Sequence, residues 1–361
     1  MARLCDSRPC SDKPAALCKL HMPNFVIQVH PEEYHDFVSY LTGLEFQRIV
    51  LRTPAWRFKT APRLIWQYVF GACQLLGRMQ SLRNARTLVV FSHFAFVVKA
   101  MARLGLVRYR KLFCFGFFLH DQRWMGIFRW LAKLDRASDH YIIFSEPEAE
   151  LYESELGIGR ERLHFVPLGD WAEARQDPLV DHITEYGDYY FAGGRSNRDY
   201  LPLIEAFRSL PARLLIVCSE SNVEELGSVE LPANVEILCD LAANEFDLYL
   251  RRCKAGIIPL KNDLGSSGQS VALALMRSAK CVIATDVAGV RDYVEDGVSG
   301  FLVQDIQAHA PAVIRQLESD SDRVEAMGRA SRVLYEQHFS KNIAAAAFEL
   351  VLSADRNDSA A

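Results

Sequence analysis

Continuous apolar stretches alternate with segments of helical periodicity along most of this chain, and this alternation limits the folds open to it. Runs such as Thr87–His93 and Cys281–Asp286 are apolar at most inner positions, which is typical of strands buried on both faces of a parallel sheet. Amphipathic segments such as 61–84 lie between the runs and are predicted to be helices. Because parallel strands need helical crossovers, the pattern predicts an α/β fold built from Rossmann-like, doubly wound sheets.

The expected strands divide into two groups, which predicts two domains. A polar stretch at 170–186, which contains Pro178, separates the groups. The first group comprises strands at 24–30, 47–52, 87–93, 111–120, 141–145 and 163–168, and the second comprises strands near residues 189, 214, 235, 256 and 281. We therefore expect a disordered leader at 1–22, an N-terminal Rossmann-like domain at 23–172, a C-terminal one at 187–339, and a last helix at 340–353 that can pack back on the first domain.

Composition narrows the class of protein. Half of the residues are hydrophobic and 24% are charged, as in soluble globular proteins. The nine cysteines include no Cys-x-x-Cys pair, so metal spacing is absent and a reducing compartment is favoured over a disulfide framework. The N-terminal stretch has no apolar signal-peptide core, and no apolar run approaches the roughly 20 residues of a membrane-spanning helix. We expect a cytoplasmic protein.

Two glycine-rich loops follow expected strands in the second half. Gly193 and Gly194 end a strand, and Arg195 and Arg198 follow at once. The stretch 261–270 is rich in Gly and Ser and opens a helix. Free backbone N–H groups at a helix start bind anions, and guanidinium groups bind phosphate in bidentate geometry. The loops favour a phosphate site; an ordinary βαβ turn and a solvated turn with two surface arginines are the alternatives.

Together these blocks resemble the nucleotide-binding half of the GT-B glycosyltransferases, in particular the retaining glycosyltransferase family 4. The resemblance spans about 189–339 and is carried by Gly-Arg at 194–195, Leu-Ile-Glu-Ala-Phe at 203–207, Val-Ile-Ala-Thr-Asp at 282–286 and Asp-Gly-x-x-Gly-Phe-Leu-Val at 296–303. It implies a GT-B fold, in which two Rossmann-like domains face a central cleft. It also implies that the second domain binds a nucleotide-sugar donor.

The resemblance assigns roles to individual residues. Arg195 matches the family arginine, and Arg198 falls where the family has a lysine. The two family glutamates fall on Ser266 and Ala274, so both carboxylates are missing, and Asp263 is the candidate replacement for the first. Residues 266–269 resemble a Ser-Ser-Gly-Gln variant of the acidic loop. The implied donor-binding residues are Gly194, Arg195, Arg198, Ser266, Ser267, Gly268, Gln269 and Ser270, the last two as neutral hydrogen-bonding substitutes.

Three histidines are candidates in the first half. His120 follows an apolar strand, as does the family histidine that contacts the donor sugar, and with Asp263 it completes our catalytic candidates. The alternative is a strand-end histidine that caps the next helix. His93 and His30 are candidates for the acceptor side. His30 stands where the family has a glycine-rich first loop, so the acceptor site of this chain differs from the usual pattern.

The net charge of −4 hides an asymmetry. No Asp or Glu occurs between Phe46 and His120, whereas thirteen Lys and Arg side chains and several aromatic ones do. The segment 123–133 is a further cationic, aromatic helix candidate. Basic charge with aromatic anchors favours peripheral association with the inner face of a membrane or an anionic acceptor. A solvated domain with core aromatics is the alternative, and no nucleic-acid-binding module is recognisable.

The expected function is transfer of a sugar from a UDP- or GDP-sugar to a glycan or lipid-linked acceptor, with retention of configuration. The nucleotide sugar is a substrate, and the arginines would take the role that a metal has elsewhere, so no cofactor or metal is expected. Two alternatives stay open. The missing glutamates suit a non-catalytic nucleotide-sugar-binding protein, and a GT-B sugar-nucleotide epimerase or hydrolase would need no large acceptor.

Overall fold

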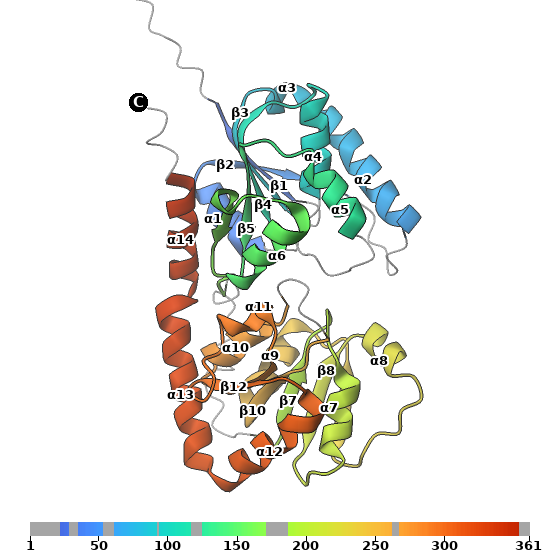
Figure 1. Ribbon diagram of the computed structural model, residues 1–361, viewed down its shortest axis with the longest axis vertical. Coiled ribbons are helices and arrows are strands. Elements are labelled where there is room, and N and C mark those ends of the chain that lie inside the picture. The colour runs from blue at the N-terminus through green and yellow to red at the C-terminus, as the bar shows by residue number, and fades with distance from the viewer. Residues whose placement is uncertain are drawn as a thin grey trace, which may run out of the picture.

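The computed structural model describes residues 22–28, 35–52, 61–91, 94–116, 125–170, 187–261 and 267–353. These residues form two parallel six-stranded sheets, one above the other in Figure 1, with helices on both faces of each. The α/β fold with two Rossmann-like sheets that the sequence predicts is confirmed. No helix in the described ranges is long and apolar enough to cross a membrane.

The N-terminal sheet has the strand order β2-β1-β3-β4-β5-β6, and all its pairs are parallel. Its strands are β1 Asn24–Gln28, β2 Phe46–Val50, β3 Ala85–Phe91, β4 Tyr109–Phe115, β5 Asp139–Ile143 and β6 Leu163–Phe165. Its helices are α1 His35–Gly43, α2 Ala61–Leu76, α3 Met79–Leu82, α4 Phe94–Arg103, α5 Met125–Ala132, α6 Pro147–Leu156 and the 3-10 helix η2 Arg160–Arg162.

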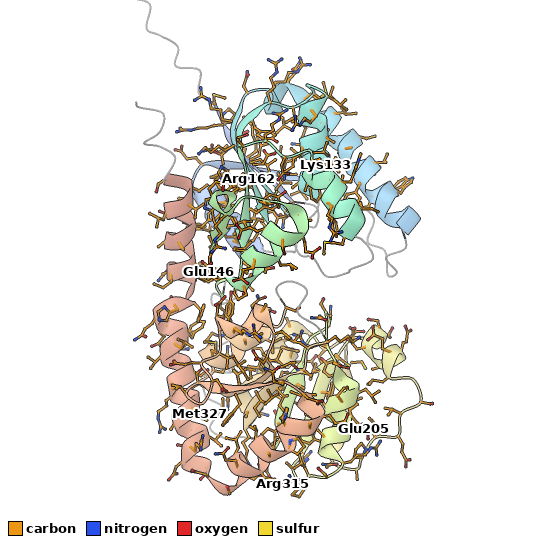
Figure 2. All side chains as sticks on the ribbon, viewed as in Figure 1. Lys133, Glu146, Arg162, Glu205, Arg315 and Met327 are labelled. Carbon is orange, nitrogen blue, oxygen red and sulfur yellow. The ribbon has the colours of Figure 1, made fainter. Side chains whose placement is uncertain are left out.

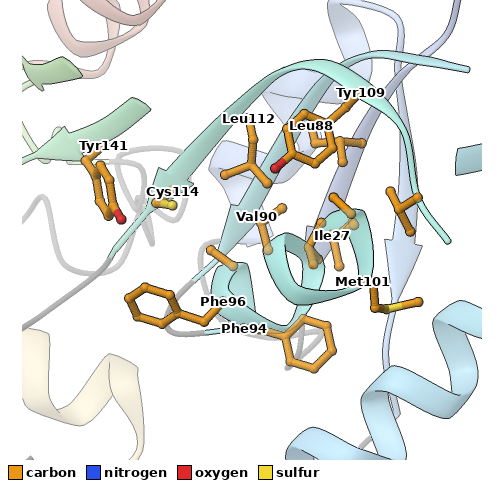
Figure 3. Packing of buried hydrophobic residues seen from close by; sticks show 14 of the residues in the cluster. Ile27, Leu88, Val90, Phe94, Phe96, Met101, Tyr109, Leu112, Cys114 and Tyr141 are labelled. Carbon is orange, nitrogen blue, oxygen red and sulfur yellow. The ribbon is translucent and has the colours of Figure 1, made fainter. Parts of the chain in front are cut away.

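The core of this domain lies on both faces of the sheet. Figure 3 shows one face, where Phe94 and Met101 of α4 pack against Ile27 and Val90 of the central strands. All four side chains are buried. Strands with apolar side chains on both faces need such helical cover, which explains their continuous apolar sequence.

The C-terminal sheet has the order β12-β11-β10-β7-β8-β9, again with parallel pairs. Its strands are β7 Tyr190–Gly193, β8 Leu214–Cys218, β9 Val235–Cys239, β10 Ala255–Ile258, β11 Cys281–Thr285 and β12 Gly300–Val303. The helices are α7 Tyr200–Phe207, α8 Glu220–Leu226, α9 Ala243–Arg252, α10 Gln269–Arg277, α11 Ala288–Arg291, α12 Ile306–Ser319, α13 Ser321–His338 and α14 Lys341–Ser353.

The structure differs from the sequence-based expectations in two places. The single helix expected at 61–84 is broken, because α2 ends at Leu76, and a turn at Gly77 and Arg78 precedes α3. Glycine favours such a break, since it costs helical stability. The structure also contains a strand that the sequence did not predict, β12, which pairs with β11. A Cβ atom at Gly300 would lie 2.0 Å from the Val282 carbonyl oxygen, so only glycine allows this strand to begin there.

The last helix crosses from one domain to the other. In Figure 1, α13 runs beside the C-terminal domain and α14 beside the N-terminal one. The Phe348 ring of α14 packs edge-on against Phe37 and Phe115, with ring centroids 5.2 and 6.2 Å apart. Phe348 and Ala344 are fully buried in the core under this face of the N-terminal sheet. The chain terminus therefore contributes core side chains to a domain formed mainly by the first half.

The two domains meet where β5 and β11 end. The Tyr293 hydroxyl donates to the Phe144 carbonyl oxygen at 2.7 Å and accepts from the Leu168 backbone N–H at 3.1 Å. The backbone N–H of Glu146, which Figure 2 labels between the domains, donates to an Asp292 carboxylate oxygen at 2.7 Å. These contacts bring the carboxyl ends of strands from both sheets together, and such ends carry the ligand sites of open α/β sheets.

Candidate functional site

A cavity of about 370 Å³ lies at the carboxyl ends of β7, β8 and β9. The starts of α9 and α10 close it. Its lining residues come from four segments that are far apart in the sequence: Gly194, Arg195, Val217, Cys218, Leu241, Ala243, Phe246, Ser270 and Val271. One side is therefore apolar, and the other carries a guanidinium group and a helix start. A planar apolar group and an attached anion would both find complementary surface here.

The apolar wall depends on Cys218 and Phe246. Burial raises the pKa of the Cys218 thiol to about 12, and the adjacent Cys239 adds to the shift. The thiol is therefore neutral near pH 7 and behaves as a small apolar group. The Phe246 ring lies edge-on to the Phe191 ring, with centroids 5.2 Å apart. A Cβ atom at Gly193 would lie 2.6 Å from the Phe246 ring, so this glycine lets the ring reach the cavity.

Gly194 and Arg198 shape the loop after β7. Gly194 has a φ of 123°, and a Cβ atom there would lie 2.4 Å from the Arg198 guanidinium group. Arg198 is buried, and its Nε donates to the Gly193 carbonyl oxygen at 3.0 Å while Nη1 donates to the Ser196 carbonyl oxygen at 2.7 Å. Burial lowers the pKa of this guanidinium group. Arg198 thus holds the loop from beneath and is not among the residues that line the cavity.

Arg195 has the opposite environment. Its side chain is 67% exposed, and its Nη2 lies 3.5 Å from an Asp240 carboxylate oxygen. Its backbone is fixed, because Asn222 Nδ2 donates to the Arg195 carbonyl oxygen at 3.1 Å. An exposed ion pair of this length contributes little stability. The guanidinium group can therefore exchange Asp240 for an anionic ligand in the cavity without disturbing the loop.

The start of α10 forms the other polar edge of the cavity. Gly268 precedes the helix with a φ of 89°, a left-handed conformation that glycine adopts without strain. A Cβ atom there would lie 3.0 Å from Ile258 and 3.2 Å from Val290. The N–H groups of the first turn of a helix have no partners within the helix, and the dipole makes this end positive. Ser270, in this first turn, lines the cavity.

Gln269, the first residue of α10, has a buried amide nitrogen without a partner among the described residues. The residue is 3% exposed, and its Nε2 donates no hydrogen bond there. An unsatisfied buried amide costs about 1–3 kcal/mol. Native proteins leave few such groups, so each one is a candidate contact for a missing ligand. Gln269 directly precedes Ser270, which lines the cavity.

The structure brings together the described part of the predicted donor site. Gly194, Arg195 and Ser270 line the cavity, whereas Arg198 is buried under the loop. The remaining candidates in the described ranges, Ser267, Gly268 and Gln269, lie at or just before the start of α10. Outside the described residues lie His30, His93, His120, Asp263 and Ser266. Among the residues that the structure describes, no cluster of three or more His, Cys, Asp or Glu residues could hold a metal ion.

Sequence reasoning missed the apolar wall and Asn222. Val217, Cys218 and Phe246 have the same apolar character as the core residues of the sheet, so their sequence alone does not separate them from the core. Their position at strand ends was a usable signal, because ligands bind there. Asn222 gave no signal, since its contact with Arg195 joins residues 27 positions apart.

Comparison with known proteins finds a family match for part of the second half and solved structures that share the fold. A model of the family described as glycosyl transferases group 1 matches residues 191–319. A search of curated protein sequences finds no match. Many solved structures share the fold. One is a glycosyltransferase from Rickettsia africae, which has a TM-score of 0.68 and is 13% identical to this chain. The match covers 92% of this chain and 98% of that protein.

Two further structures hold nucleotides. The Anabaena protein HepE, in complex with UDP and glucose, has a TM-score of 0.68 and 17% identity, with 92% of this chain and 100% of that chain covered. S. aureus MnaA, in complex with UDP, has a TM-score of 0.58 and 15% identity, with 93% and 97% covered. The predicted GT-B fold is confirmed by these similarities.

Proposed function

We propose that this protein is a glycosyltransferase that uses a nucleotide-sugar donor. The observation that carries the proposal is the cavity between Arg195 and the start of α10, which joins an apolar wall to two sources of positive potential. The nucleoside would lie against Val217, Cys218 and Phe246. The diphosphate would lie between the Arg195 guanidinium group and the N–H groups of Gln269 and Ser270.

The similarities support this assignment. The family match covers the strands and helices that build the cavity, from β7 to α12. HepE binds UDP, glucose and UDP-glucose according to its solved complexes. A UDP-sugar is therefore the first donor to test, with a GDP-sugar as the second.

The proposed chemistry follows from the charge that develops on the leaving group. As the glycosidic bond breaks, negative charge grows on the departing diphosphate, and Arg195 with the α10 dipole would stabilise it. In a retaining reaction the acceptor hydroxyl attacks from the face that the nucleotide leaves, and the departing phosphate can take its proton. This step needs positioning more than a strong base. We propose a glycan or lipid-linked acceptor, His120 and Asp263 as catalytic candidates, and no requirement for a metal or cofactor.

Ala274 motivates a second candidate function. It stands on α10 where the resemblance expects a glutamate, and its methyl group cannot bind ribose hydroxyls. A protein that binds the donor without turnover would fit this loss. Titration calorimetry and a turnover assay on the same sample separate the two functions, because only an enzyme releases nucleoside diphosphate when acceptor is present.

Arg195→Ala tests the donor site. Losing a charge-assisted hydrogen bond to phosphate should weaken donor binding by roughly 1.5–3 kcal/mol. Calorimetry with UDP-sugars and GDP-sugars measures this change. Arg329→Ala is a matched control, because Arg329 is also exposed and ion-paired but lies on α13. Equal donor affinity in wild type and Arg195→Ala would rule out this site.

A further inference from the structure

One face of α2 carries apolar side chains that remain exposed among the described residues. Trp66 is 52% exposed, and Val69 and Phe70 are exposed beside it. The Trp66 and Phe70 rings are stacked, with centroids 5.1 Å apart. The opposite face of the helix is buried: Gly71 approaches α4 so closely that a Cβ atom there would lie 2.6 Å from the Phe94 ring. The helix thus has a packed face and an exposed aromatic face.

A second helix repeats this arrangement. On α5, Trp130 is 63% exposed and Ile127 is 47% exposed, while Met125 and Ala132 are buried. The two helices flank α4: Tyr68 of α2 stacks on Phe94, and Phe128 of α5 stacks on Phe96. Both therefore pack beside α4 on the same face of the N-terminal sheet (Figure 1).

Basic residues far outnumber acidic ones in the segment that contains both helices. Between Phe46 and Leu134 the sequence contains one acidic residue, Asp121, against sixteen Lys and Arg residues. Exposed basic side chains follow both helices: Arg78 lies two residues after the end of α2, and Lys133, labelled in Figure 2, comes directly after α5. A surface with this charge attracts anions over a distance of about one Debye length.

We propose that the exposed faces of α2 and α5 dock this protein on an anionic lipid bilayer. This docking face comprises Trp66, Val69, Phe70, Ile127 and Trp130, with Arg78 and Lys133 at its edges. Trp and Phe favour the interfacial zone of a bilayer, and helices that pair an apolar face with basic residues lie in its plane. Nucleic acid would leave the apolar side chains without partners. The basic residues at its edges favour a surface of anionic headgroups over a neutral one.

Docking would place the bilayer beside the N-terminal domain only, because α14 and the C-terminal sheet lie away from these helices in Figure 1. The inference is independent of the donor site, since none of the docking residues lines the cavity. Membrane binding and donor binding can therefore succeed or fail separately.

Vesicle co-sedimentation of the full chain tests the proposal. The probes are vesicles of phosphatidylcholine alone and of phosphatidylcholine mixed with phosphatidylglycerol, each at low and high salt. Wild type should bind the anionic vesicles at least about tenfold more tightly, and salt should release it. Arg78→Gln/Lys133→Gln should weaken that binding roughly 30-fold, since each basic residue near the surface contributes about 1 kcal/mol. Trp66→Ser/Trp130→Ser should weaken it at least about tenfold.

Val333→Ser/Leu350→Ser is the matched control, because both residues are exposed and apolar but lie on α13 and α14. It should bind vesicles like wild type. The charge variant keeps the test decisive if the tryptophan variant fails to fold. Equal binding to both lipids, or binding that neither variant reduces, would overturn the proposal. Sedimentation velocity that shows a dimer lost in Trp66→Ser/Trp130→Ser would also overturn it and would make the occupant a second copy of this chain.

Discussion

The Asn197 side-chain amide donates to the Ser267 hydroxyl oxygen across 3.0 Å. This bond joins the loop that follows β7 to the segment that begins α10, so it ties together the two polar edges of the cavity. A second tie runs along the backbone, where the Asp199 N–H donates to the Pro259 carbonyl oxygen at 3.1 Å. The distance between Arg195 and the start of α10 is therefore set by contacts that do not involve the ligand.

Replacing Asn197 should loosen the donor site. Asn197 has a φ of 55°, which glycine tolerates and alanine does not. Asn197→Gly removes the bond to Ser267 and keeps the backbone, so donor affinity should fall about 3- to 10-fold, the value of one hydrogen bond. Asn197→Ala should also lower the melting temperature. Calorimetry measures the donor affinity, and thermal unfolding measures the melting temperature. Unchanged donor affinity in both variants would show that donor binding does not need the hydrogen bond between Asn197 and Ser267.

Arg198→Ala should lower stability more than it lowers donor binding. The substitution leaves the Gly193 and Ser196 carbonyl oxygens without their donor and empties a buried volume. We expect the free energy of unfolding to fall by about 2–3 kcal/mol, as for other buried hydrogen-bonding groups. Urea unfolding measures this loss. A variant that is as stable as wild type but does not bind donor would instead place Arg198 on the diphosphate.

Gly268→Ala should be unfavourable for a conformational reason. A side chain at a φ of 89° costs about 1–2 kcal/mol, and the added methyl group would press on Ile258 and Val290. Gly126→Ala on α5 is the control, because a Cβ atom there meets nothing within 4 Å. In a helix this change should stabilise by about 0.5–1 kcal/mol. The two variants should therefore shift the unfolding midpoint in opposite directions. A stabilising Gly268→Ala would contradict the conclusion that this position requires glycine.

Gln269→Met should separate binding from stability. Methionine has a similar shape but no amide, so the unsatisfied Nε2 disappears and the free energy of unfolding should stay equal or rise. Donor affinity should fall at least about threefold if the amide contacts the donor. Thermal unfolding with and without donor measures both quantities. A loss of stability without donor would instead show that the amide serves the fold through contacts within the protein.

The local chemistry of the donor loops could be predicted from the sequence. Gly194, Arg195 and Ser270 follow strands or begin a helix, and the periodicity of the flanking residues places them there. Arg198 shows the limit of this reasoning. It lies three residues from Arg195 with the same guanidinium group, and only the fold decides that one is exposed and the other buried.

By itself, the sequence determined most of the strands and helices, the parallel sheets and the position of the two glycine-rich loops, because these follow from periodicity and glycine placement over short stretches. The tertiary structure alone decided which apolar residues line the cavity and that Asn197 meets Ser267. It also decided that Tyr293 joins the domains and that Trp66 and Trp130 remain exposed. Such contacts join residues that are distant in the chain, and a pattern of local hydrophobicity carries no information on which distant surfaces will meet.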